Sequence, residues 1–117
     1  MPFPTIQTAI PVKRYQYGEY GVTVLDEIES SDAAEYKYLM AFVKEGESSP
    51  VVFVSSEASS PEKRSEGRYQ LRVINSTMDE VMSVDDVWSQ LEGFCEQGLN
   101  IGSQLLGLDD DEPYPLS

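Results

Sequence analysis

The sequence contains no histidine. Histidine is the commonest general base, the usual partner of a nucleophilic Ser or Cys, and the commonest protein ligand of transition metals. Its absence excludes most familiar hydrolase mechanisms. The chain also lacks a glycine-rich phosphate loop, and its acidic run at 109–112 lacks the spaced ligands and central glycine of an EF-hand. We therefore expect no metal site, no cofactor and no enzymatic activity.

Cysteine and long apolar runs are equally scarce. Cys95 is the only cysteine, so it has no disulfide partner within the chain. It falls among apolar residues, where burial keeps the pKa of a thiol high, and we expect it to be structural. No run of about 18 apolar residues is present, and the N-terminus lacks the basic and apolar segments of a signal peptide. These features predict a cytoplasmic protein.

Basic residues are also few in this sequence. Eight Lys and Arg stand against 21 Asp and Glu, which gives a formal net charge of −13. Such a chain repels nucleic-acid backbones and anionic membranes, so we expect neither as a partner. A basic or neutral protein is the partner that this charge favours.

The length and patterning predict one α+β domain at 10–107, after an extended N-terminal arm at 1–9 and before an acidic C-terminal tail at 108–117. Alternating apolar residues predict an antiparallel, curved sheet of five to six strands. The segment at 55–67 has no large apolar residue and is interpreted as a mobile loop. The expected strands are 10–17, 20–29, 36–43, 51–54 and 68–75, with a possible short one at 77–82.

Apolar residues then recur at spacings of three and four from Val84 to Leu105, which predicts one long amphipathic C-terminal helix packed on the sheet. Ser83 is the expected N-cap, and Gly107 the expected stop. The helix is possibly broken near Gly98, because glycine weakens a helix interior. The 36–43 strand is apolar on both faces, so the second sheet face needs cover, either from sheet curvature or from a homodimer.

The acidity is concentrated at one end of the chain. Residues 79–117 contain ten acidic residues and no basic one. Four of the eight basic residues instead fall at 63–72, where they can meet the acidic helix within the fold or between subunits. Glu92 and Glu96 are a like-charge i,i+4 pair, which slightly destabilises a helix. The candidate partner-binding residues are Asp85, Asp86, Glu92, Glu96, Asp109, Asp110, Asp111 and Glu112.

These observations favour a non-catalytic protein-binding module whose acidic helix and tail dock a basic protein partner. Two alternatives remain open at this point. Tyr36, Tyr38 and Trp88 are candidates for a small-molecule pocket between the sheet and the helix. An enzyme that uses carboxylates or tyrosine is the other alternative, because the separation of two carboxylates is a property of the fold.

Overall fold

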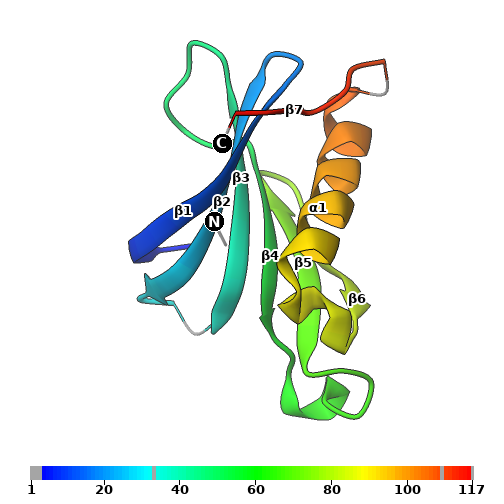
Figure 1. The fold of residues 1–117 in the computed structure, drawn as a ribbon. Helices are drawn as coiled ribbons and strands as arrows, with labels where there is room; N and C mark the ends of the chain where they lie inside the picture. The colour runs from blue at the N-terminus through cyan, green and yellow to red at the C-terminus, as the bar shows by residue number, and fades with distance from the viewer. Residues whose placement is uncertain (1–3, 33, 109, 117) are drawn as a thin grey trace.

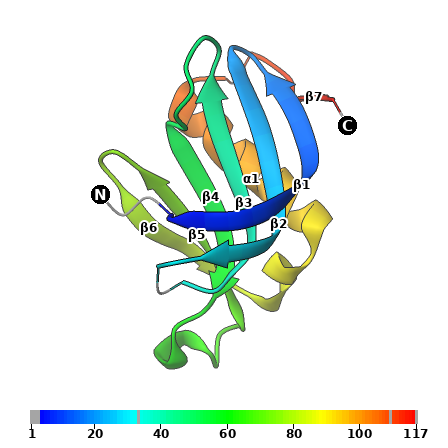
Figure 2. The same ribbon diagram turned by 90° about the vertical axis from the view of Figure 1, so that its left-hand side faces the viewer.

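A computed structural model describes residues 4–32, 34–108 and 110–116 of the chain. It contains one antiparallel sheet with the strand order β6-β5-β4-β3-β2-β1-β7, packed against a single long C-terminal helix, α1 (Figure 1). The sheet is curved and does not close on itself (Figure 2). The predicted α+β class is therefore confirmed. The strands are β1 (Ile6–Tyr17), β2 (Tyr20–Ser30), β3 (Tyr36–Lys44), β4 (Val52–Ala58), β5 (Tyr69–Asn75), β6 (Asp79–Val84) and β7 (Tyr114–Pro115).

Two strands are longer than their sequence pattern indicates. β1 begins at Ile6, within the segment interpreted as an extended arm. β4 continues to Ala58, and so takes in the first four residues of the segment interpreted as a mobile loop. Serine is small enough to be buried in a strand when its hydroxyl is satisfied, and the Ser56 hydroxyl donates to the backbone oxygen of Trp88 over 2.5 Å. Only the rest of that segment, which includes the short 3-10 helix η1 (Pro61–Lys63), connects β4 to β5.

The helical region is divided at a different place from the one predicted. A 3-10 helix, η2 (Asp86–Ser89), precedes α1 (Leu91–Leu106), and the extended backbone of Gln90 separates the two. Asp85, not Ser83, is the N-cap, because its carboxylate accepts from the Val87 amide over 2.9 Å. α1 runs without a break through Gly98, so the possible break there is not observed. Gly107 ends α1 in a left-handed conformation (φ 68°), as expected.

The main core lies between α1 and one face of the sheet. Phe42 on β3 and Phe94 on α1 are fully buried there, and Tyr38 stacks on Phe94 with 5.6 Å between ring centroids. Two glycines let the helix approach the sheet: a Cβ at Gly98 would lie 2.8 Å from Cε of Met40, and one at Gly102 would overlap the Phe42 ring. The glycine spacing thus serves close packing within the fold. No helix of the described residues is long and apolar enough to cross a membrane.

The opposite sheet face is covered by the chain itself. Leu39 and Ile74 lie outside the main core and are nonetheless fully buried. The first part of β1 and the last part of β2 bend across β3, β4 and β5 on this side (Figure 2). Three register irregularities between β1 and β2, together with a positive φ of 48° at Glu27, accompany the bend. Sheet curvature therefore covers Leu39 and Ile74 within one chain.

Candidate functional site

The outer surface of α1 presents exposed carboxylates. Glu92 and Glu96 are exposed, one turn apart, followed along the helix by exposed Asn100 and Gln104. Among the described residues neither glutamate takes part in an ion pair. Glu92 lies in the first turn of α1 and interacts favourably with the positive end of the helix dipole. Glu96, one turn later, is repelled by the like charge of Glu92.

Asp85 and Asp86, at the start of η2, combine exposure with structural bonds. The Asp85 carboxylate caps η2, and the Asp86 carboxylate accepts from the backbone amide of Arg68 over 2.7 Å. Both side chains remain exposed at the N-terminal end of the helical region. They precede Glu92 and Glu96 along the chain, at the start of the helical region.

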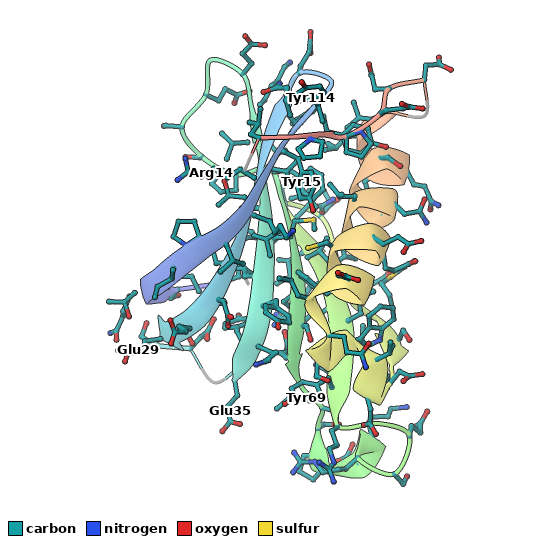
Figure 3. All side chains as sticks on the ribbon, viewed as in Figure 1. Arg14, Tyr15, Glu29, Glu35, Tyr69 and Tyr114 are labelled. Atoms are coloured by element: carbon teal, nitrogen blue, oxygen red, sulfur yellow. The ribbon has the colours of Figure 1, made fainter. Side chains whose placement is uncertain are left out.

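The acidic segment after α1 does not project from the body of the protein. Leu108 is buried (5% exposed), and the chain then crosses to the other edge of the sheet, where β7 pairs with Tyr15 and Gln16 of β1 (Figures 1 and 3). The Leu116 amide donates to the Arg14 backbone oxygen over 2.8 Å. We call residues 110–116 the C-terminal strap. Its three acidic residues, Asp110, Asp111 and Glu112, are all exposed. The eighth predicted residue, Asp109, lies outside the described residues.

The strap places negative charge beside the negative end of a helix. α1 has no basic residue in its last turn, and Asp110, Asp111 and Glu112 follow shortly after its end. The dipole of a helix favours cations at this end, so the arrangement lowers the stability of the fold. The acidity at this position is therefore not explained by folding.

The basic residues at 63–72 do not neutralise the acidic helix. Arg72 binds Asp79 through two hydrogen bonds of 2.6 and 2.9 Å and also reaches Glu57 over 3.1 Å. Lys63 lies 3.6 Å from Glu66, its neighbour three residues along. These contacts leave the carboxylates of α1 without a basic partner in the described part of the chain.

Sequence reasoning missed the polar cluster around Glu57. This glutamate is buried (5% exposed) and accepts hydrogen bonds from Ser55, Gln70 and Arg72. The cluster joins β4 to β5 and β6, so its members are brought together only by strand register. The alternation of β5 was the available signal, because it placed Arg72 and Gln70 on the same face.

The three residues of the predicted aromatic pocket are not brought together. β3 is irregular between Tyr36 and Tyr38, so Tyr36 pairs with Glu57 while Tyr38 pairs with Ser56. The two tyrosines therefore point to opposite faces of the sheet, and strict alternation was the wrong assumption. Tyr38 is buried against Phe94, and the Trp88 indole donates to the Ser83 hydroxyl over 3.2 Å. The space between the sheet and the helix is used for packing at these positions.

The candidate nucleophiles have environments that suppress ionisation. Burial is the main cause that raises the pKa of the Cys95 thiol and of the Tyr36 hydroxyl, which donates to Asp32 over 2.8 Å. Burial, followed by the neighbouring Cys95, raises the pKa of Tyr15 to about 12. Within the described ranges no group of three or more His, Cys, Asp or Glu is placed to hold a metal ion. At Cys95, Tyr36 and Tyr15 the surroundings therefore favour the neutral, protonated form.

Comparisons of this chain with protein-family models, with curated proteins and with solved structures give no match.

Proposed function

We propose that this protein is a non-catalytic protein-binding module that docks a basic segment of a partner on its acidic face. The acidic face is the set of exposed carboxylates along η2, α1 and the C-terminal strap. The observation that supports the proposal is their exposure without an ion pair among the described residues. Its members are Asp85, Asp86, Glu92, Glu96, Asp110, Asp111 and Glu112.

The form of the acidic face suits an elongated basic segment. α1 has 16 residues and is therefore about 24 Å long, with carboxylates before it, along it and after it. A row of like charges along a rigid helix attracts a basic chain from a distance and orients it. Because the strap is tied to β1 by β7, the carboxylates at the far end are held to the same body.

Apolar anchors are present beside one end of the row. Val81 and Met82 on the edge strand β6 are about half exposed, at 49% and 50%, and β6 leads directly into Asp85 and η2. Charges give orientation and association rate, whereas apolar side chains at the centre of an interface usually give most of the affinity. We therefore place the stable part of the interface at the η2 end of the acidic face.

A capture experiment with matched baits tests this proposal. The full chain, a Glu92→Gln/Glu96→Gln variant and a Glu45→Gln/Glu47→Gln variant are immobilised and exposed to lysate of the source cells at low salt. Glu45 and Glu47 are exposed on the turn between β3 and β4, so the control removes the same charge from another surface. We expect one basic protein, retained in stoichiometric amount by the full chain and by the control, and released by salt.

The α1 variant should retain clearly less of that protein. Equal retention by both variants would contradict docking on α1, and retention of no protein in stoichiometric amount would contradict the proposed function itself.

A further inference from the structure

A second surface of the molecule has the opposite charge. A pocket of about 410 Å³ opens at the end of the sheet where β3 begins and β4 ends, beside the connection that contains η1. Glu35 and Tyr69, two of its lining residues, lie at this end of the molecule (Figure 3). Three of the eight basic residues of the chain also line it: Lys37, Arg64 and Arg68.

These three cations are not neutralised within the described part of the protein, where none of them forms an ion pair. Arg64 is oriented by a hydrogen bond of 2.9 Å to the Ser59 backbone oxygen, and the Lys37 ammonium lies 5.3 Å from the centre of the Tyr38 ring. Arg68 is exposed, and its backbone amide and oxygen are bonded to Asp86 and Ser59, whereas its guanidinium makes no hydrogen bond among the described residues. Glu35 is the one acidic residue among those that line the pocket.

One aromatic ring completes the lining. Tyr69 is partly buried and alternates along β5 with Leu71 and Val73 of the main core, so its ring lies on the helix side of the sheet. Tyr36 also borders the pocket, but its side chain turns to the opposite face, where its hydroxyl donates to Asp32 over 2.8 Å. A partly buried ring offers a flat apolar surface at a small entropic cost. The pocket therefore combines a cationic part with an aromatic part.

From this combination we propose that the pocket binds a small organic anion, in which a phosphate or carboxylate group is attached to a ring. The guanidinium groups of Arg64 and Arg68 are suited to the oxygens of such an anion, because each offers several donors in a fixed plane. The ring of the ligand packs against Tyr69. A volume of about 410 Å³ lies in the range of small-molecule sites. A polyanion is disfavoured, because the rest of the chain carries a large negative charge.

The site is tested by NMR titration of the full chain with phenyl phosphate and with phenylacetate. Benzyl alcohol serves as a neutral ligand with the same ring. We expect both anions to shift the amide signals of Ala58 and Tyr69, and the tighter of the two identifies the preferred acidic group. Benzyl alcohol should bind at least about tenfold more weakly than that anion, because it lacks the charge.

Variants assign the binding to the pocket. Arg68→Gln removes a cation whose side chain has no bond within the described fold, so it should weaken anion binding about tenfold without affecting stability. Lys44→Gln is the matched control, because Lys44 is an exposed cation at the other end of β3. Equal binding by the two variants would overturn the proposal, as would benzyl alcohol that binds as well as the anions, or the absence of shifts with both anions. No residue of the acidic face lines the pocket, and Arg68→Gln keeps the backbone amide that Asp86 binds, so this result is distinguishable from the docking function.

Discussion

The ring of Phe42, on β3, occupies the space that a Cβ atom at Gly102, on α1, would need. This contact sets how closely the helix approaches the sheet. Gly98, one turn earlier, meets a different neighbour, because the nearest atoms to its Cβ position are Cε and Sδ of Met40, at 2.8 and 2.9 Å. Methionine is flexible and can move aside, whereas a buried phenylalanine ring cannot.

Alanine substitutions at these two glycines should therefore differ. Gly102→Ala should lower the free energy of unfolding by about 2 kcal/mol or more, because overpacking against Phe42 exceeds the gain in helix propensity. Gly98→Ala, the matched control, should change it by less than about 1 kcal/mol. Urea unfolding followed by circular dichroism measures both values. Equal losses for the two variants would show that α1 does not lie on β3 as described.

The buried Glu57 should make Arg72 important for stability. Arg72→Met removes the guanidinium and leaves the Glu57 carboxylate, 5% exposed, without its charged partner. We expect a loss of about 3–5 kcal/mol in urea unfolding, because an isolated buried charge is poorly solvated. The double variant Arg72→Met/Glu57→Gln should recover most of that loss. A double variant as unstable as the single one would show that the unpaired Glu57 charge does not cause the loss of stability.

The Arg72–Asp79 pair should make stability depend on pH in the acid range. The hydrogen bonds from Arg72 are the main cause that lowers the pKa of Asp79 in the folded state. A lowered carboxyl pKa stabilises the fold above the unfolded-state value of about 3.9, and this contribution is lost as the pH falls through the folded-state pKa. The difference in stability between the full chain and Asp79→Asn should therefore be largest near pH 6 and shrink below about pH 4. A difference that is constant with pH would contradict the pairing.

Cys95 should react slowly with thiol reagents in the folded protein. It is 5% exposed, and burial is the main cause that raises the pKa of its thiol. Labelling by 5,5′-dithiobis(2-nitrobenzoate) at pH 8 should be at least about a hundredfold slower in buffer than in denaturant. Rapid labelling of the native chain would mean that the thiol is accessible and that its structural role is wrong.

Leu108, which precedes the C-terminal strap, should anchor the end of α1 to the sheet. Leu108 is buried where the chain leaves α1, and it lies against Gly18 in the turn between β1 and β2, since a Cβ at Gly18 would be 2.8 Å from its Cδ2 atom. Leu108→Ala should lower the free energy of unfolding by about 2–3 kcal/mol. Leu116→Ala, at a side chain that is 57% exposed, is the control and should cost less than about 0.5 kcal/mol. Equal effects would mean that Leu108 does not anchor the chain between α1 and the C-terminal strap.

Much of the fold follows from local patterns. The alternation in β2 and β5 and the periodicity of α1 gave the α+β class and the antiparallel sheet. The errors occurred where a tertiary contact overrides a local preference. Gly98 remains helical at a point where α1 closely approaches Met40, and Ser55 and Ser56 lie in β4 with their hydroxyls bonded within the fold. The bend of the β1–β2 hairpin depends on register irregularities that leave no clear signal in the sequence.

The candidate site could be predicted from the sequence less well than the fold. The exposed glutamates of α1 were found because helical periodicity alone distinguishes outer from inner positions. The residues of the predicted aromatic pocket do not come together, because one irregularity in β3 turns Tyr36 and Tyr38 to opposite faces. The basic pocket escaped notice because Lys37 lies far along the chain from Arg64 and Arg68, and only strand pairing brings them to one end of the sheet.

The most direct test of docking on the acidic face is the affinity of the captured partner for three proteins, measured by calorimetry over a series of salt concentrations. These proteins are the full chain, Glu92→Gln/Glu96→Gln and Glu45→Gln/Glu47→Gln. We expect the α1 variant to bind about tenfold more weakly at low salt and to show a shallower dependence on salt, because each contacted charge contributes to both. The control should match the full chain. If the two variants lose affinity equally, or if neither loses it, the partner does not bind through the carboxylates of α1, and the central claim is wrong.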